Sequence, residues 1–317
     1  MKKNAKKFGL VIGIILFIGI IGFGYFVGMT VFDNSIVNVD AEPPSFEKVN
    51  FDIEQFESSY GIEQIAIEST LDGHDIPADY ITINGKEKAP TIIMIHGLGD
   101  DRKTYYPVAD MLLKNGYNIL SYDQRNSGDN VADYTTYGYL EQHDLLDYVT
   151  YLDEILDENQ KLGILGFSLG SQTAGIYLGT EHANELIDFA ILDSPLSNMS
   201  YVISSEMQDV GIPVDFLMFT GNLVTRLKLG FSYEDTNVLN YIDKTEVPIL
   251  IINSKADTIT PYFMGEEIYN TISHSNKEMF TVDDSKHVEI FSNYPREYEK
   301  NIIDPGLFNK LVDNMIC

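Results

Sequence analysis

The sequence has 317 residues, of which 44% are hydrophobic and 22% are charged. Asp and Glu number 48 against 21 Lys and Arg, and the resulting net charge of −27 argues against nucleic acid and against docking on anionic lipid or an anionic wall polymer through a broad basic face. The only cysteine is Cys317, so an intrachain disulfide is impossible, and a terminal thiol outside any motif argues against a cysteine nucleophile.

The amino terminus predicts a membrane anchor. Lysines at positions 2, 3, 6 and 7 precede an uncharged run over residues 8–32. A helix of that length rises about 37 Å, which is enough to cross a hydrocarbon core of about 30 Å. The run is longer than a signal-peptide core and has no A-x-A-like exit, so we expect an uncleaved, single-pass signal anchor in the cell membrane. The lysines predict that residues 1–7 are cytoplasmic and that the remaining chain is extracellular.

The chain after the anchor predicts one α/β domain. Residues 33–50 are polar, contain Pro43-Pro44 and lack helical periodicity, so we expect a spacer. A short amphipathic segment and a hairpin over 62–67 and 75–83 follow. Apolar strands then alternate with helices, which predicts a doubly wound, mostly parallel sheet in a domain over residues 51–317. Its site is expected at the carboxyl ends of the strands.

One serine stands in a strand-turn-helix pattern. An apolar run over 161–165 leads into Gly166-Phe167-Ser168-Leu169-Gly170, and a stretch of small residues follows. A nucleophile elbow needs glycines two residues before and two after the serine, because the strained turn brings backbone segments too close for a Cβ. The pattern predicts that Ser168 is a nucleophile.

An acid and a histidine follow the serine in the required order. The buried strand over 247–253 breaks before Asp257, and His287 lies in the loop after a strand over 278–282. We expect His287 to accept the Ser168 proton and return it to the leaving group, while Asp257 orients the imidazole. Asp193, at the end of another strand, is the alternative acid. The carboxylates at 283 and 284 are expected at the surface.

An oxyanion hole requires backbone amides beside the serine. The predicted donors are Leu169, directly after the nucleophile, and Leu98 in the loop His96-Gly97-Leu98-Gly99, which follows an apolar strand over 91–95. His96 is expected to brace this loop, because it precedes the nucleophile in the chain. The other histidines, at 74, 143, 182 and 274, lack metal-ligand spacing, so we predict neither a metal nor an organic cofactor.

With these motifs in this order over residues 60–300, the chain resembles the α/β-hydrolase superfamily. Within it, the chain is similar to bacterial, often membrane-anchored serine hydrolases grouped with serine aminopeptidases and acylglycerol lipases. The passages 121–128, 191–195 and 230–233 carry this closer resemblance. Many relatives have glycine at the position of Asn126 and histidine at the position of Phe167. The resemblance implies the α/β-hydrolase fold and a Ser168-His287-Asp257 triad.

Two charged residues follow the second parallel strand. Asp123 and Arg125 could contact substrate, but we favour an ion pair that pins their loop.

About fifty residues between two strands predict a small helical cap, at about 196–244. Apolar residues between 216 and 227 recur on one helical face. This face could line an acyl pocket, but we favour packing onto the main domain. Substrate choice is expected to depend on the cap.

The sequence therefore predicts a serine hydrolase that cleaves carboxylic esters, with a small-molecule or lipid-like acyl ester as substrate. An aminopeptidase is an alternative, and it would need a carboxylate of the cap to hold the substrate ammonium. The available cap carboxylates are Glu206, Asp209, Asp215 and Glu234. Acyl transfer on the same groups and a non-catalytic binding protein are further alternatives. The oligomeric state stays open.

Overall fold

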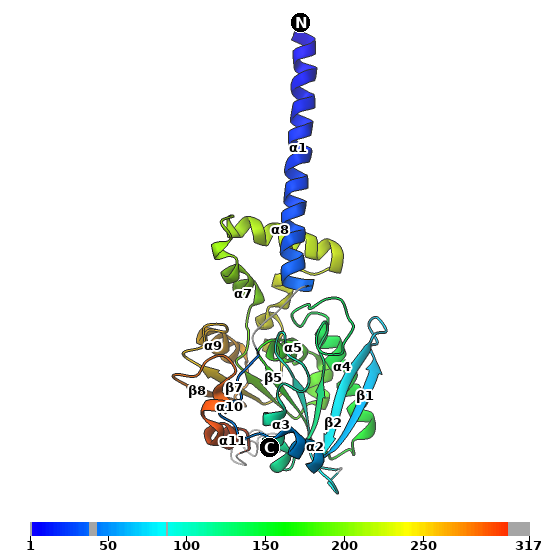
Figure 1. Ribbon diagram of the computed structural model, residues 1–317, viewed down its shortest axis with the longest axis vertical. Coiled ribbons are helices and arrows are strands. Elements are labelled where there is room, and N and C mark those ends of the chain that lie inside the picture. Colours follow the sequence, from blue (N-terminus) through cyan, green and yellow to red (C-terminus); the bar gives the residue numbers. More distant parts are fainter. Residues whose placement is uncertain (1, 38–42, 87, 304–317) are drawn as a thin grey trace. The chain divides into compact units, whose positions relative to one another are not determined.

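The computed structural model describes residues 2–37, 43–86 and 88–303 (Figure 1). Cys317 lies outside the described residues. The chain divides into two compact units, one formed by Met1–Asn38 with Ser200–Asp235 and the other by Val39–Met199 with Thr236–Cys317. We call these the helical unit and the sheet unit.

Eight strands of the described residues form one sheet in the order β1-β2-β4-β3-β5-β6-β7-β8. Figure 1 shows β1 and β2 at one side of this sheet and β7 and β8 at the other. The strands are β1 Gly61–Glu68, β2 Asp75–Thr82, β3 Thr91–Ile95, β4 Asn118–Tyr122, β5 Leu162–Phe167, β6 Phe189–Asp193, β7 Ile249–Ser254 and β8 Lys277–Val282. β2 is antiparallel to both β1 and β4, and the remaining pairs are parallel. The predicted leading hairpin and mostly parallel sheet are therefore confirmed.

Helices cover both faces of this sheet. They are α2 Ile53–Ser59, α3 Tyr106–Lys114, α4 Glu141–Ile155, α5 Leu169–Tyr177, α6 Glu181–Leu186, α9 Tyr262–Thr271, α10 Ile290–Asn293 and α11 Pro295–Ile303. Short 3-10 turns are η4 Val238–Asn240 and η5 Ile242–Lys244. Neighbouring residues of a strand point to opposite faces, so Ile93 joins the apolar cluster of Leu145 in α4, whereas Ile92 joins that of Leu112 in α3. Burial on both faces explains why every residue of the central strand β3 is buried.

The helical unit contains the long amino-terminal helix and most of the predicted cap. Its elements are α1 Lys2–Phe32, the π-helical turn η1 Asp33–Val37, α7 Met199–Glu206 except its first residue, η2 Gln208–Val210, α8 Val214–Leu229 and most of η3 Tyr233–Thr236. The stretch Ile12–Val37 is long and apolar enough to cross a membrane. One side of α8 packs on α1, with Leu217 buried beside Val27 and Val31, whereas Phe219, Leu223 and Leu227 of the predicted apolar face are exposed. We expected the apolar face of α8 to pack on the main domain instead. Sequence periodicity indicates that a helix face is buried, but it does not show which element covers that face.

The expected spacer differs from the structure at both ends. Asp33–Val37 extends the helix by a π-helical turn in which Ser35 and Ile36 are buried. The ring of Phe46 packs against that of Tyr105 in the sheet unit, with the two ring centroids 5.9 Å apart. Residues 38–42 of the predicted spacer lie outside the described residues.

Candidate active site

Ser168 lies in a strained turn between β5 and α5. Its φ of 51° and ψ of −116° are unusual for a residue with a side chain. A Cβ on Gly166 would lie 2.5 Å from the carbonyl oxygen of Gly170, and one on Gly170 would lie 2.0 Å from that of Ile95. Only glycine at both positions lets the start of α5 approach the ends of β3 and β5 this closely.

Three side chains from three loops meet at this turn. His287 Nε2 lies 2.8 Å from Ser168 Oγ, and His287 Nδ1 lies 2.8 Å from Asp257 Oδ2. An ionised carboxylate only accepts hydrogen bonds, so it selects the tautomer with the proton on Nδ1. Nε2 is then an acceptor facing the serine hydroxyl. The arrangement can therefore remove a proton from Ser168.

The carboxylate of Asp257 is held by its own loop. Its Oδ1 accepts the backbone N–H groups of Ile259 and Thr260, both at 2.9 Å, and Oδ2 accepts the Thr260 hydroxyl at 2.9 Å. These donors fix the position of the carboxylate before any substrate binds.

The alternative acid, Asp193, has other partners. Its carboxylate accepts the Tyr298 hydroxyl at 2.8 Å and the Ser194 hydroxyl at 3.0 Å. Burial raises the pKa of Asp193 to about 6. The backbone carbonyl of Asp193 accepts the N–H of Ser168 at 2.9 Å, so this residue supports the turn through its main chain.

The loop after β3 runs beside Ser168. A Cβ on Gly97 would lie 3.5 Å from Ser168 Cβ, so Leu98 follows a residue in close contact with the turn. Leu169 is the first residue of α5, and the first amides of a helix have no carbonyl partner within it. The two expected oxyanion donors thus lie on the two segments that flank the serine hydroxyl.

His96 braces this loop from within the protein. Its Nδ1 lies 2.7 Å from the Gly97 carbonyl oxygen, and its Nε2 accepts the backbone N–H of Gln124 at 2.9 Å. Both contacts suit the neutral ring protonated on Nδ1, and burial lowers the pKa of His96. This geometry agrees with a bracing role and leaves no free nitrogen for a base.

Comparison with known proteins agrees with the topology and the turn. A family model described as "alpha/beta hydrolase fold" matches residues 90–224. The Pyrococcus furiosus esterase Pf2001 superposes with a TM-score of 0.65 at 25% identity, covering 85% of this chain and 98% of the esterase. This chain has the α/β-hydrolase fold.

Two curated relatives extend the comparison. This chain is 27% identical over 277 residues to the uncharacterized protein YqkD of Bacillus subtilis, and the match covers 80% of this chain and 87% of YqkD. It is 27% identical over 193 residues to the lysophosphatidylserine lipase ABHD12 of Xenopus tropicalis, covering 57% of this chain and 46% of that protein. The fold and its esterase and lipase neighbours support hydrolase activity.

A buried carboxyl group beside the site was missed by the sequence reasoning. Asp100 lies in the loop after β3, and its Oδ2 accepts the Tyr105 hydroxyl at 2.8 Å. The same oxygen would lie 2.7 Å from a Cβ on Gly97. Burial raises the pKa of Asp100 to about 6. No local sequence pattern distinguishes it from an aspartate at the surface.

Phe167, where many relatives have histidine, packs against the same tyrosine. The rings of Phe167 and Tyr105 are stacked, with centroids 3.9 Å apart and planes 10° apart. The departure from the common pattern therefore links the elbow to the oxyanion loop through an aromatic stack.

The two charged residues after β4 do not pair with each other. Arg102 forms ion pairs with Asp123 and, at 3.0 Å, with Asp79. Arg125 binds Asp72 at 2.7 Å and, through a second nitrogen, Asp144. The loop is pinned by ion pairs as expected, but the partners come from distant segments. Among the residues that the structure describes, no group of His, Cys, Asp and Glu could hold a metal ion.

Three further positions singled out in the sequence, Asn126, Asp283 and Asp284, lie in loops. Asn126 has a φ of 57°, a left-handed conformation that asparagine tolerates better than most residues, which explains how it replaces glycine there. Asp283 forms an exposed ion pair with Lys255, and Asp284 accepts the Tyr294 hydroxyl. Within the described part of the chain, the hydrogen-bond partners of His287 are Ser168, Asp257 and Thr260, and neither Asp283 nor Asp284 is among them.

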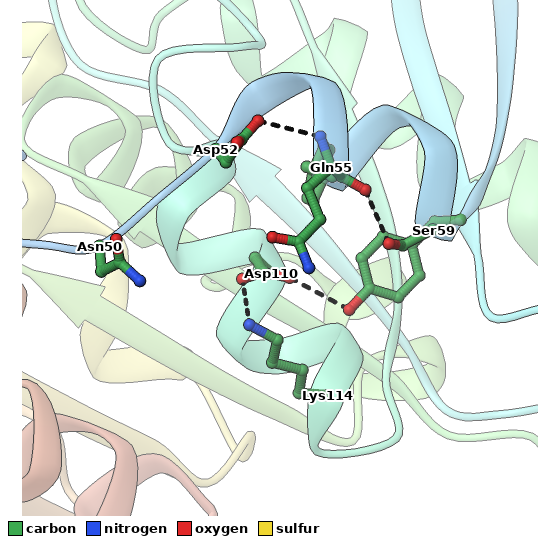
Figure 2. Close-up of a pocket in the computed structure, with 8 residues that line it drawn as sticks. Asn50, Asp52, Gln55, Ser59, Asp110 and Lys114 are labelled. Carbon is green, nitrogen blue, oxygen red and sulfur yellow. Dashed lines mark hydrogen bonds and ion pairs between the residues drawn. The ribbon is translucent and has the colours of Figure 1, made fainter.

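A polar hollow of about 260 Å³ lies elsewhere in the sheet unit, between α2 and α3 (Figure 2). Asp110 accepts hydrogen bonds there from Tyr60 at 3.1 Å and from Lys114 at 2.6 Å. Burial, together with Asp110, raises the pKa of Tyr60 to about 12. The hollow is lined by none of Ser168, His287 and Asp257, its Asp110 and Lys114 pair with each other, and Asp52 accepts the backbone N–H of Gln55, so we assign it no part in catalysis.

Proposed function

We propose that this protein is a serine hydrolase that cleaves carboxylic ester bonds through an acyl-enzyme on Ser168. The observation that carries the proposal is the continuous hydrogen-bonded line from Ser168 through His287 to Asp257, with both contacts at 2.8 Å. Such a line is what activation of a serine hydroxyl requires.

In the first half-reaction, Ser168 Oγ attacks the ester carbonyl and its proton passes to His287 Nε2. Asp257 stays ionised and stabilises the imidazolium. The backbone N–H groups of Leu98 and Leu169 donate hydrogen bonds to the oxyanion. The tetrahedral intermediate then breaks its bond to the alcohol oxygen, which takes the proton from His287. In the second half-reaction, water attacks the acyl-enzyme by the same route, which releases the acid and restores the Ser168 hydroxyl.

The proposal includes the place of the reaction. Residues 8–32 cross the cell membrane, residues 1–7 are cytoplasmic and the catalytic domain within residues 51–317 is extracellular. The stretch over Ile12–Val37, which is apolar enough to span a membrane, and the lysines before it support this topology. Substrates are acyl esters that reach the outer membrane surface.

The test uses the full chain in detergent and a fluorophosphonate, followed by peptide mass spectrometry. We expect one adduct, on Ser168, which is lost in Ser168→Ala and kept in Ser58→Ala, a change at an exposed serine. An adduct that persists after Ser168→Ala would contradict the proposal.

Turnover separates the enzyme classes. p-Nitrophenyl esters of graded chain length are expected to react with a higher kcat/KM than aminoacyl amides. The reverse order would favour a peptidase, and dependence of product formation on an added alcohol would favour acyl transfer.

A further inference from the structure

Helix α8 packs closely against the carboxyl-terminal half of α1. The ring of Phe216 stacks on that of Phe23, with centroids 6.2 Å apart. A Cβ on Gly28 would lie 2.5 Å from the carbonyl oxygen of Thr220. Small residues at such positions let two helix backbones approach, as in helix pairs within membranes.

The contact continues beyond the glycine. A Cβ on Gly221 would lie 2.4 Å from a side-chain carbon of Val31, and Lys228 places its ammonium 4.8 Å from the centre of the Phe32 ring. Ser35 and Tyr233 exchange a buried hydrogen bond of 2.7 Å. Figure 1 shows α8 running across α1 at this level. Contacts with α8 and Tyr233 therefore extend along the chain from Phe23 to Ser35.

The position of the crossing along α1 sets its depth. About 20 helical residues fill a hydrocarbon core of about 30 Å. Counted from Phe8, the first uncharged residue, such a segment ends near Val27, and Asp33 is the next charged residue. Contacts of α8 with positions 23–32 then lie at the boundary between acyl chains and headgroups. A helix that runs across α1 at this level lies along that boundary.

The surface of α8 suits the same boundary. Phe219, Leu223 and Leu227 are 66%, 49% and 72% exposed. They recur every four residues, so they form one line along the helix, which we call the apolar stripe. Contiguous exposed apolar side chains of this size mark an interaction surface.

The charges of α8 point to lipid as the occupant. The last turn of α8 carries Arg226 and Lys228, and its one acidic residue, Asp215, lies at the opposite end of the helix, although acidic residues outnumber basic ones 48 to 21 in the chain. Amphipathic helices at membrane interfaces combine an apolar face with basic side chains that meet lipid phosphates.

We infer that α8 is an interfacial membrane helix. Its apolar stripe inserts among the acyl chains of the outer leaflet, and Arg226 and Lys228 bind the phosphates of anionic lipids. The inference rests on the membrane crossing of α1 in the proposed function. The cap would thereby be anchored by lipid contacts of its own in addition to α1.

The test places an environment-sensitive nitrobenzoxadiazole probe on single cysteines of the full chain in vesicles of phosphatidylcholine and phosphatidylglycerol. In a Cys317→Ser background, Leu223→Cys reports on the stripe and Gly19→Cys reports on α1. A Cβ at Gly19 would meet nothing within 4 Å, and Leu223 is exposed, so both changes leave the fold intact. Retained ester turnover checks this.

Quenching by lipids brominated along the acyl chain distinguishes the outcomes. We expect both probes to be quenched, with Leu223→Cys most strongly quenched by bromine near the glycerol end and Gly19→Cys by bromine near the chain end. Quenching at Gly19→Cys without quenching at Leu223→Cys would overturn the inference and leave the crossing intact. An unquenched Gly19→Cys would contradict the proposed crossing itself.

A second measurement tests the basic residues. Arg226→Gln together with Lys228→Gln is expected to abolish the preference of the Leu223→Cys probe for phosphatidylglycerol over phosphatidylcholine. An unchanged preference would overturn the role of these two side chains.

Discussion

The surroundings of Ser168 and the contact between α1 and α8 both depend on glycines that permit close backbone approach, but they differ in what fixes the result. Around Ser168, buried hydrogen bonds such as that from the Ser168 amide to Asp193 define the position of each group. Between α1 and α8 the contact is mainly apolar, with Val27, Val31 and Leu217 at its centre. Polar networks define one geometry, whereas apolar contacts tolerate small shifts. Changes near Ser168 should therefore act in an all-or-none manner, and changes in the helical unit should be graded.

The largest expected effect is at His287. His287→Ala removes the only side chain within hydrogen-bonding distance of Ser168 Oγ in the described part of the chain, so kcat for ester hydrolysis should fall by about 10⁶-fold. Steady-state kinetics with a p-nitrophenyl ester measure the loss. His143→Ala, at an exposed histidine, is the matched control and should retain full activity.

The two candidate acids should differ sharply. Asp257→Asn should lower kcat by about 10,000-fold, because the amide selects the wrong imidazole tautomer while the shape is kept. Asp193→Asn should lower kcat much less, since its side chain bonds Tyr298 and Ser194 rather than the imidazole. A greater loss for Asp193→Asn would reverse the assignment of the acid.

The buried carboxyl of Asp100 gives a pH dependence of stability. Its folded pKa of about 6 lies above the unfolded value of about 3.9, so the folded state holds the proton more tightly between these pH values. Its contribution to stability is complete below about pH 4 and is lost as pH rises through 6, by up to about 3 kcal/mol.

Asp100→Asn, whose amide oxygen can still accept the Tyr105 hydroxyl, should lose less stability than the wild type between pH 5 and pH 8. Thermal unfolding at the two pH values measures the difference. Parallel losses in the two proteins would show that Asp100 does not titrate as stated.

The smallest expected effect is in the helical unit. Gly28→Ala forces a Cβ to 2.5 Å from the Thr220 carbonyl, so α8 must shift, at a cost of about 1–3 kcal/mol. Gly24→Ala is the matched control, since its Cβ would lie 3.9 Å from its nearest neighbour. Limited proteolysis around residues 208–213 should be faster in Gly28→Ala than in Gly24→Ala. Equal rates would indicate that the helices do not rely on this glycine.

Much of the sheet unit followed from the sequence, because strands buried on both faces read as continuous apolar runs and because an elbow needs glycines at fixed spacing. The sequence order of Ser168, Asp257 and His287 also indicated three loops at one edge of the sheet. Their joint role in ester cleavage stays a prediction that the kinetics above test.

Pairings across long distances in the chain could not be predicted. Arg102 and Arg125 bind carboxylates from several segments, and local sequence does not show which of 48 acidic residues lies nearby in space. The packing of α8 on α1 was missed for the same reason. Asp100 was missed because a single aspartate in a glycine-rich loop has no pattern that separates it from a surface residue.

The ring of Phe46 belongs to a cluster of aromatic rings that packs against the turn at Ser168. It lies against Tyr105 and, at 6.4 Å, against Phe291, while Tyr105 in turn supports Phe167, the residue before Ser168. Under the proposed function, a proteolytic cut that frees an active domain from the membrane must therefore fall before Phe46. A released form that starts after Phe46 would lose one ring of this aromatic cluster. The turn at Ser168 would then be held less firmly in place.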